Sequence, residues 1–389
     1  EKLDALISKK SISAYIGFDC TAKSLRIGSL IQIMCLRLLQ KHGHRPIVLL
    51  GGGTTRIGDP SGKEETRKIL SEKQIESNIK NIQKIFNIFL KSDNPKLKPI
   101  FVNNYKWLGK LNYIKFLREI GKHFTINKML TFDSVKTRLE REQSLSYMEF
   151  NYMILQAYDF LELNKKEKCS LQIGGSDQWG NIVNGVELIK RHSNNQTFGL
   201  TTPLITLASG AKMGKTADGA IWLDKKFLSS YDYWQFWRNT DDRDVIKFLK
   251  YFTDLKVKEI EDLENKEINE LKILLANKTT AMLHGEKEAQ SSEKAAKEAF
   301  SENSSGSNLP SIKINKKILN DKVNIIEFVI LSKLETSKSE IRRLIKGNAI
   351  KINNNIINDE KFSVNENLFN ENYLKLSIGK KRHLKIILI

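Results

Sequence analysis

Short apolar runs alternate with longer helical runs across the first 225 residues, and this alternation limits the folds open to the chain more than any other feature. AYIGF is followed by LIQIMCLRLLQK, and CSLQIGG is followed by NIVNGVELIKRH. Strands that alternate with helices are typical of a parallel sheet covered by helices. The sequence therefore predicts an α/β domain in which ligands gather at the carboxyl ends of the strands, among the polar loops.

The rest of the chain has a different pattern. Between about residues 228 and 300 the strand signal fades, and runs such as NELKILLANKTTAMLHGEKEAQ predict helices. SENSSGSNLPS, residues 301–311, is rich in Ser, Asn and Gly and predicts a linker. From residue 325 the tail carries 12 Lys or Arg against 7 Asp or Glu, and its basic helix SKSEIRRLIKG precedes the strand-like AIKINNNII. Such a basic α+β module is typical of RNA binding, and a merely solvated charged face is the alternative.

The charge of the whole chain is also consistent with RNA binding. A formal net charge of +19 favours a polyanionic partner, a nucleic acid or a membrane surface, although a Lys-rich composition throughout would also produce it. No apolar run approaches the roughly 18 residues of a membrane span, and no charged-then-apolar leader opens the chain, which starts at Glu1 and not at Met. The three cysteines are isolated, which favours a reducing compartment over disulfides or a zinc site.

Three loops have the composition of phosphate sites. The polar stretch after AYIGF runs into a helix start, where free N–H groups favour anions, although many helices begin with a simple cap. GGGTTRIGDPSGKEETR, residues 51–67, resembles a Walker A loop but lacks its Lys-Ser/Thr pair. It combines Asp59 with Lys63 and Arg67, a mixture that suits a ligand with both an ammonium group and phosphates. ASGAKMGKTADG, residues 208–219, is a Gly-rich loop whose two lysines can close over phosphates.

A helix and a strand add further polar side chains. Tyr152, Gln156 and Asp159 lie at i, i+4 and i+7 of NYMILQAYDFLEL, hence on one stripe of a helix whose other faces are apolar. We expect this helix to be buried, and because a buried carboxylate without a partner is costly, Asp159 needs one. That partner is either a structural hydrogen bond or a ligand hydroxyl or ammonium. In LQIGGSDQWGN the glycines permit close approach of a ligand, and Asp177 can hold ribose hydroxyls.

Taken together, these segments resemble the bacterial and organellar tyrosyl-tRNA synthetases, a family of class I aminoacyl-tRNA synthetases. The most specific matches are YIGFD, IGDPSGK, YMILQAYDFL, QIGGSDQWGN and KMGKT, the last being this family's form of the Lys-Met-Ser-Lys-Ser loop. The resemblance covers nearly the whole chain from about residue 12. It implies four parts: a Rossmann-like catalytic domain over 1–227, a helical anticodon-side domain over 228–300, a linker over 301–324 and an S4-like RNA-binding domain over 325–389.

The resemblance also implies a role for each matching residue. At the tyrosine, Tyr15 and Asp159 bind the phenol hydroxyl and Asp59, Tyr152 and Gln156 hold the ammonium, with Thr54, Asn104 and Gln178 lining the pocket. The residues implied at ATP and the adenylate are Gly17, Asp19, Gly28, Ser29, Gly175, Asp177 and Lys215. The residues implied at the departing pyrophosphate are Thr21, Lys63, Arg67, Lys212, Lys215 and Thr216.

Arg26 is the main departure from the family. LRIGS stands where the family has Leu-His-X-Gly-His, so Ser29 is a tolerated variant and Arg26 replaces a histidine that contacts an ATP phosphate. Arginine is permanently charged and binds phosphate bidentately. We therefore expect an active enzyme in which Arg26 is a catalytic phosphate ligand.

The implied reaction is the activation of tyrosine by ATP to tyrosyl-adenylate and pyrophosphate, followed by transfer of tyrosine to the 3′ end of tRNA(Tyr). ATP is expected as its magnesium complex, with no structural metal. A homodimer without membrane attachment is expected in the cytoplasm, or in an organelle if a leader has been removed. One alternative is a catalytically weakened synthetase-like RNA-binding protein, because of Arg26. Another is the sister enzyme for tryptophan, which has no need for Tyr15 and Asp159 and is not expected to carry an S4-like tail.

Overall fold

The chain divides into two compact units, Glu1–Asp224 and Lys225–Ile389. The structure is a computed structural model, and we describe each unit by itself. The described residues are 1–61, 70–210, 213–216, 219–263, 265–300, 309, 311–321, 323–370, 372–379 and 382–389.

A five-stranded sheet forms the centre of the first unit, with the strand order β3-β2-β1-β4-β5. Every neighbouring pair is parallel, and Tyr15 of β1 lies between Ile47 of β2 and Gln172 of β4. The chain leaves β1 toward β2 on one side and later returns to β4 on the other, so the strand order reverses beside β1. Such a switch point opens a crevice at the carboxyl ends of the strands. The strands are β1 Ser13–Asp19, β2 Arg45–Gly51, β3 Ile100–Asn103, β4 Cys169–Gly175 and β5 Phe198–Thr202.

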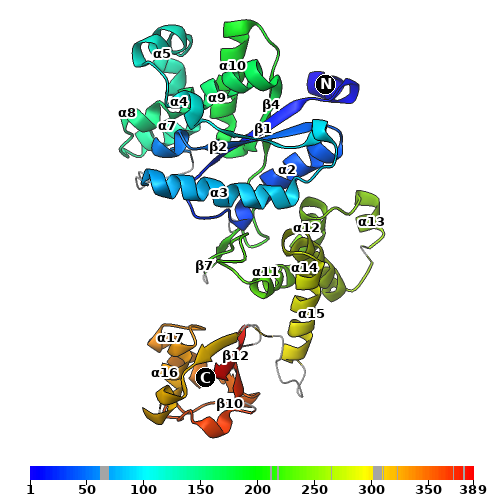
Figure 1. The fold of residues 1–389 in the computed structure, drawn as a ribbon, viewed down its shortest axis with the longest axis vertical. Helices are drawn as coiled ribbons and strands as arrows, with labels where there is room; N and C mark the ends of the chain where they lie inside the picture. Colours follow the sequence, from blue (N-terminus) through cyan, green and yellow to red (C-terminus); the bar gives the residue numbers. More distant parts are fainter. Residues whose placement is uncertain are drawn as a thin grey trace. The chain divides into compact units, whose positions relative to one another are not determined.

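Helices cover both faces of this sheet, as the alternating sequence pattern predicts. Figure 1 shows α2 (Leu30–Lys41) and α3 (Glu72–Phe89) on one face and α9 (Tyr152–Glu167) and α10 (Trp179–Ser193) on the other. The expected Rossmann-like α/β architecture is confirmed. The shorter helices of this unit are α1 Lys2–Lys9, α4 Tyr105–Leu108, α5 Tyr113–Glu119, α6 Ile126–Met129, α7 Asp133–Glu140 and α8 Tyr147–Phe150.

The helix α9 is buried on almost every side, which confirms the expectation from its apolar sequence. Phe160 and Ala157 are fully buried and pack with Tyr15 and Ile47 of the sheet. The helix ends at Glu167, and the cap residue Lys168, whose φ of 53° is left-handed, turns the chain directly into β4. This packing places the polar stripe of α9 at the carboxyl ends of β1 and β2.

A small hairpin closes the first unit. β6 (Lys215–Thr216) pairs antiparallel with β7 (Gly219–Ala220). The chain then runs back along the turn that follows β1, where Arg26 and Trp222 form an isolated antiparallel bridge. The turn after β1, one of the loops predicted to bind phosphate, is therefore in direct contact with the segment that follows the second predicted loop.

The second unit begins with helices, as predicted for residues 228–300. Its core here is aromatic: Trp234, Tyr233 and Trp237 are buried, and the Trp237 ring packs 5.1 Å from that of Phe252. The helices are α11 Ser230–Arg238, α12 Val245–Phe252, α13 Val257–Glu261, α14 Ile268–His284 and α15 Glu286–Phe300.

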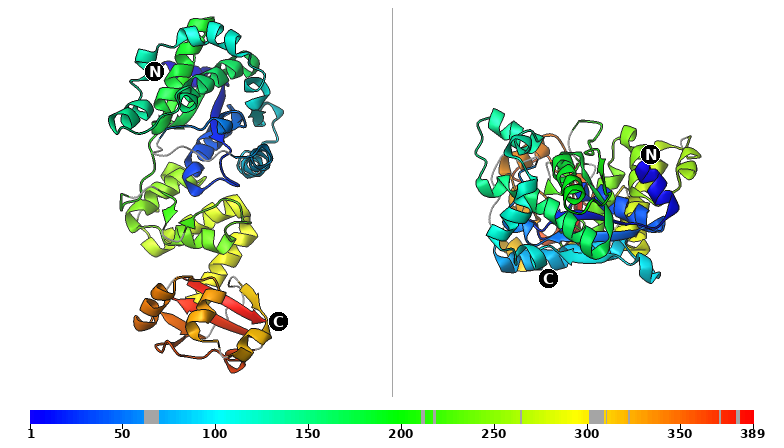
Figure 2. Two further views of the ribbon diagram at one scale, coloured as in Figure 1. Left: turned by 90° about the vertical axis from the view of Figure 1, so that its left-hand side faces the viewer. Right: turned by 90° about the horizontal axis from the view of Figure 1, so that it is seen from above.

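A mixed sheet with its own hydrophobic core forms the end of the chain (Figure 2). The strand order is β10-β9-β11-β12-β8, and α16 (Ile325–Leu331) and α17 (Lys338–Lys346) pack on it. The strands are β8 Ser311–Ile314, β9 Ile350–Ile352, β10 Asn355–Ile356, β11 Tyr373–Ile378 and β12 Arg382–Leu388. β8 lies inside the range that we expected to be a linker, because its apolar residues pair with β12 far away in sequence.

Within the described ranges, no helix has both the length and the apolar character needed to cross a membrane.

Candidate active site

A cavity of about 370 Å³ opens at the carboxyl ends of β1 and β4, where the strand order reverses. Polar and glycine residues from β1, β4, α9 and the loops after β1 and β2 line it. The structure therefore brings most of the predicted site residues together. Those that line the cavity are Tyr15, Gly17, Asp19, Thr21, Gly28, Ser29, Thr54, Asp59, Tyr152, Gln156, Asp159, Gly175, Asp177 and Gln178.

Asp159 is almost completely buried and has two structural hydrogen bonds. Asn104 Nδ2 donates to one carboxylate oxygen at 2.8 Å, and Trp107 Nε1 donates to the other at 2.7 Å. Burial raises the pKa of Asp159 to about 8, although these two donors act to lower it. Each carboxylate oxygen has a second acceptor position. Asp159 thus has both the structural partner that its burial requires and capacity for a ligand hydroxyl.

The Tyr15 hydroxyl is the most informative atom of the site. Tyr15 is 1% exposed, and its hydroxyl finds no hydrogen-bond partner among the residues that the structure describes. Burial, with Asp159 nearby, raises the pKa of Tyr15 well above its usual value, so the phenol stays protonated. A buried polar atom without a partner costs about 1–3 kcal/mol. Because Tyr15 lines the cavity, a polar ligand there would satisfy it.

Gln172 is a cavity residue that the sequence reasoning missed. It lies beside Tyr15 in the sheet, is 2% exposed, and its Oε1 likewise has no partner within the described part of the chain. Its signal in the sequence is a polar residue inside the apolar strand CSLQIGG. Trp107, the donor to Asp159, was also missed, because nothing in KWLGK distinguishes it from a core tryptophan.

Carboxylates and hydroxyls form a connected network on one side of the cavity. Asp19 accepts from the Thr54 hydroxyl at 2.7 Å and from the Tyr152 hydroxyl at 3.2 Å. Asn104 donates to Thr54 at 3.1 Å, which links this group to Asp159. The cavity therefore offers several fixed acceptors to a cationic or hydroxyl-bearing ligand.

Asp59 has a second set of partners. Gln178 Nε2 donates to its Oδ2 at 2.9 Å, and the backbone N–H of Ser61 donates to its Oδ1 at 3.0 Å. These bonds hold the carboxylate at the cavity wall. An ammonium group of a ligand would fit this position, as the mixed composition of the loop after β2 predicts.

Close backbone packing explains two of the glycines. A Cβ atom at Gly51 would lie 2.4 Å from Asp19 Oδ1 and 2.5 Å from Thr54 Oγ1. A Cβ atom at Gly175 would lie 2.4 Å from Asp177 Oδ1. Any larger residue at these positions would displace the polar atoms that line the cavity.

The predicted phosphate ligands are only partly described. Lys63, Arg67 and Lys212 lie outside the described residues, and for Lys215 and Thr216 only the backbone of β6 is described. Arg26 is not among the residues that line the cavity. Its guanidinium carbon lies 4.7 Å from the centre of the Trp222 ring.

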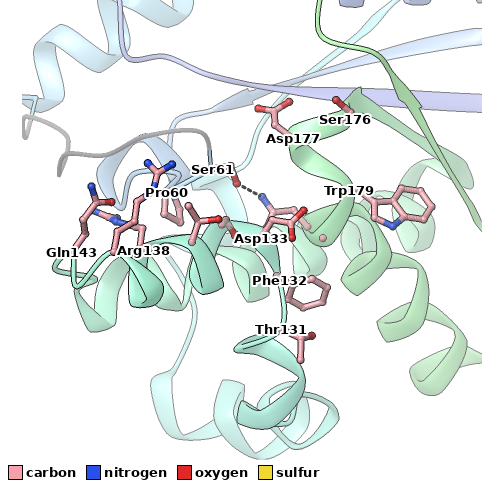
Figure 3. Close-up of a pocket in the computed structure, with 15 residues that line it drawn as sticks. Pro60, Ser61, Thr131, Phe132, Asp133, Arg138, Gln143, Ser176, Asp177 and Trp179 are labelled. Carbon is pink, nitrogen blue, oxygen red and sulfur yellow. Dashed lines mark hydrogen bonds between the residues drawn. The ribbon is translucent and has the colours of Figure 1, made fainter.

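A second cavity of about 560 Å³ adjoins the first and shares Asp177 with it. Figure 3 shows Asp133 and Arg138 of α7 on one side and Asp177 and Trp179, at the start of α10, on the other. Arg138 is fixed by a buried ion pair with Glu149 of α8, with 3.0 Å between Nη1 and Oε1.

Two family models match this chain. The model for class I tRNA synthetases (W and Y) matches residues 8–301, and the model for the tyrosine–tRNA ligase SYY-like C-terminal domain matches residues 301–386. A parallel sheet with a polar cavity at its switch point fits the first of these models. The chain belongs to the class I aminoacyl-tRNA synthetases of the tryptophan and tyrosine group.

Full-length relatives narrow the family further. The chain is 74% identical over 389 residues to the tyrosine–tRNA ligase of Pelagibacter ubique, covering 100% of this chain and 95% of the relative. It is 50% identical over 390 residues to that of Rickettsia massiliae, covering 99% and 95%. Within the class I group, the chain belongs with the tyrosine–tRNA ligases.

Solved structures agree with this assignment. A C-terminally truncated mitochondrial tyrosyl-tRNA synthetase from Coccidioides posadasii is 31% identical with a TM-score of 0.65, over 75% of this chain and 85% of that one. A tryptophanyl-tRNA synthetase from Encephalitozoon cuniculi is 15% identical with a TM-score of 0.54, over 75% and 82%, and shares the fold alone. The family consists of enzymes that use ATP as a substrate. The comparisons support neither of the two alternatives, the sister enzyme for tryptophan and a catalytically weakened synthetase-like RNA-binding protein.

Proposed function

We propose that this chain binds tyrosine in the 370 Å³ cavity, activates it with ATP and transfers it to tRNA(Tyr). The observation that carries the proposal is the pairing of an unsatisfied Tyr15 hydroxyl with a carboxylate, Asp159, that has remaining acceptor capacity. The phenol hydroxyl of tyrosine would bond to both. Phenylalanine would leave both groups without a ligand partner, and such sites reject the analogue that lacks the hydroxyl.

The amino-acid end would lie near the acceptors on α9 and on the loop after β2. Asp59, Tyr152 and Gln156 would hold the ammonium group, which leaves the tyrosine carboxylate directed at ATP. Asp177, beside Gly175, would hold the ribose of the adenylate. Both reactants are anionic, so the protein contributes mainly by positioning them and by placing cations where charge develops.

In the first step a tyrosine carboxylate oxygen would attack the α-phosphorus of ATP. The new O–P bond forms as the bond to the β-phosphate oxygen breaks, and pyrophosphate leaves with the electron pair. ATP would enter as its magnesium complex. The groups that we propose at the pyrophosphate are Thr21, Lys63, Arg67, Lys212, Lys215 and Thr216.

In the second step a ribose hydroxyl at the 3′ end of tRNA would attack the tyrosyl carbonyl and release AMP. We propose that the second cavity admits this terminal nucleoside, because it adjoins the first cavity at Asp177. The helices α11–α15 and the C-terminal sheet would contact the anticodon side of the tRNA. Since β8 belongs to that sheet, we place the S4-like domain at residues 311–389 and shorten the linker accordingly.

Tyrosine-dependent exchange between ATP and pyrophosphate tests the proposal. We expect exchange with tyrosine and none of comparable rate with phenylalanine, in the parent and in Arg26→His side by side. Exchange in Arg26→His alone would mean a synthetase scaffold with a disabled phosphate site. Absence of exchange in both proteins would contradict the proposed reaction.

We further propose a homodimer formed through α5–α8. The hydroxyls of Tyr113 and Tyr147 lie 3.0 Å apart and join α5 to α8 at the surface. The exposed large apolar side chains of this region are Tyr113, Ile114, Leu117, Ile126, Leu130, Leu139, Tyr147 and Met148.

Sedimentation equilibrium tests this surface. Ile114→Asp is expected to shift the chain from dimer to monomer. Leu38→Asp is the matched control, because Leu38 is also exposed but lies on α2, across the sheet. A dimer that survives Ile114→Asp would place the interface elsewhere.

The cytoplasm is the compartment that we propose, and fractionation of source cells tests it.

A further inference from the structure

Arg26 replaces a signature histidine, and its side chain packs on an aromatic ring. The guanidinium carbon lies 4.7 Å from the centre of the Trp222 ring, within the range of a cation–π interaction. The two residues also face each other in an antiparallel bridge. Arg26 is exposed and does not line the 370 Å³ cavity. The stack therefore adds a side-chain contact to an existing backbone contact.

This bridge joins the turn after β1 to the segment directly after the second loop that is proposed to bind phosphate. Ile27 N donates to Ile221 O at 2.9 Å, and Leu223 N donates to Leu25 O at 3.0 Å. Directly before Ile221 lies the β6–β7 hairpin. The segment directly after the hairpin is thus paired with the turn formed by residues 25–28.

The N-terminal end of the hairpin rests on the same turn. Gly214 has a φ of +86°, and a Cβ atom there would lie 2.6 Å from Ile27 Cγ2. A Cβ atom at Gly28 would lie 3.6 Å from the carbonyl oxygen of Met213. The residues directly before and after the hairpin therefore both contact the turn, and the Arg26 side chain reaches Trp222, two residues beyond the end of the hairpin.

We infer that Arg26 is a positioning residue, whose stack on Trp222 holds residues 213–216 and 219–223 on the 25–28 turn. The stack thereby sets where the hairpin presents Lys215 and Thr216 to the phosphates of ATP. This inference rests on the proposed function. Arginine suits the task because its planar cation stacks on indole and stays charged, whereas histidine is mostly neutral at pH 7.

A double-mutant cycle separates this role from direct phosphate binding. Arg26→Gln, Trp222→Leu and the double variant are compared by the single-turnover rate of adenylate formation at saturating ATP and tyrosine. An exposed cation–π contact predicts that each single variant slows the step about two- to five-fold. The double variant should then be no slower than the slower single variant. If Arg26 instead binds phosphate directly, Arg26→Gln will slow the Trp222→Leu background as much as the parent, and that result overturns the inference.

Limited proteolysis gives a readout that does not depend on catalysis. In the ligand-free full-length chain, trypsin cleavage after Lys215 should increase about two- to five-fold in both single variants. Trp222→Phe keeps a ring and should restore part of the protection. Lys23→Gln is the charge-matched control, since its Nζ lies farther from the same ring, at 5.8 Å, and it should change cleavage less.

The two failures can be told apart. Cleavage that is equal in the parent and Arg26→Gln overturns the positioning role, whatever the activity. A parent that shows no tyrosine-dependent exchange contradicts the proposed function, while the proteolysis comparison still reports on the stack.

Discussion

Trp107 Nε1 donates a 2.7 Å hydrogen bond to Oδ1 of Asp159, and neither Trp107 nor the second donor, Asn104, lines the cavity. The two donors therefore hold the carboxylate from outside the cavity and orient it toward the ligand. An indole has a single donor and no acceptor, so Trp107 stabilises an acceptor and cannot accept the phenol proton itself. This arrangement keeps an acidic group where the tyrosine hydroxyl that we propose in the cavity would need an acceptor.

Replacing Trp107 with Phe should weaken tyrosine binding without removing the ring. Asp159, with a pKa of about 8, is mostly neutral at pH 7, and the loss of a hydrogen bond between neutral groups costs about 0.5–1.5 kcal/mol, so we expect the KM for tyrosine to rise about two- to ten-fold. The KM for ATP should stay the same, because the Trp107 hydrogen bond acts through Asp159, which is proposed to contact the tyrosine hydroxyl and not ATP. Steady-state exchange kinetics measure both constants. An unchanged KM for tyrosine would mean that Asn104 alone orients Asp159.

Asp159 should make the stability of the empty protein depend on pH. Its pKa is about 8 in the folded chain, raised by burial, and near 4 in an unfolded chain. Between these values the folded state holds one more proton, so the contribution of this group to the free energy of unfolding falls as the pH rises. We expect Asp159→Asn to lose less stability than the parent between pH 5 and 8. Urea denaturation at several pH values checks this, and parallel curves would contradict it.

Tyr15→Phe should stabilise the empty protein while impairing its selectivity. The variant removes a buried hydroxyl that is unpaired within the described chain, so the free energy of unfolding should rise by about 1 kcal/mol. Tyrosine loses one hydrogen bond, and its KM should rise about three- to ten-fold, with phenylalanine unaffected. Tyr233→Phe is the matched control: an equally buried tyrosine in the second unit, whose change should leave both KM values alone. A loss of stability in Tyr15→Phe would mean that the hydroxyl has a partner.

Breaking the buried Arg138–Glu149 ion pair, which joins α7 to α8, should strongly lower the free energy of unfolding. Both side chains are at most 4% exposed, and breaking such a pair costs about 3–5 kcal/mol. Glu149→Gln should therefore lower the free energy of unfolding by that amount, whereas the double change to Met at both positions should cost less. Burial acts to raise the pKa of Glu149, but bonds from Arg138 and Ser146 outweigh it and hold the pKa below its usual value. The stabilisation is thus present above about pH 4.5 and is lost as the pH falls, which denaturation at pH 4 and 7 measures.

Deleting residues 311–389 should separate the two half-reactions. The cut removes the whole C-terminal sheet, including β8, and leaves the first unit intact. We expect tyrosine-dependent exchange within about two-fold of the parent and a loss of at least about ten-fold in tRNA charging, because basic contacts to RNA are lost. Charging of purified tRNA(Tyr) measures the second quantity. An equal loss of both activities would contradict this division of labour.

Several features could be predicted from local sequence alone. The alternation of strand and helix predicted the parallel sheet, and the spacing of Tyr152, Gln156 and Asp159 placed them on one stripe of a buried helix. The glycine-rich loops and QIGGSDQWGN indicated where ligands would lie. The predictions of the sheet and of the helix stripe are confirmed because period and helix faces are properties of neighbouring residues, whereas the place of the ligands stays a prediction.

Other features depended on the tertiary structure. The linker expected over 301–324 contains β8, since Ser311–Ile314 gains a partner only when β12 arrives beside it. Gln172 became a cavity residue because the strand order places β4 next to β1. The sequence around Arg26 does not predict its contact with Trp222. The bridge between the two segments brings the guanidinium onto the Trp222 ring.

The sequence by itself determined the order of the elements, the family and most of the residues around the cavity. Only the tertiary structure decided which of their polar atoms are paired, as with Trp107 and Asp159, and which have no partner among the described residues, as with the Tyr15 hydroxyl. The physical reason is that hydrogen-bond satisfaction is set by distances of a few ångströms between residues far apart in the chain. Those distances exist only after the strands have crossed over and packed.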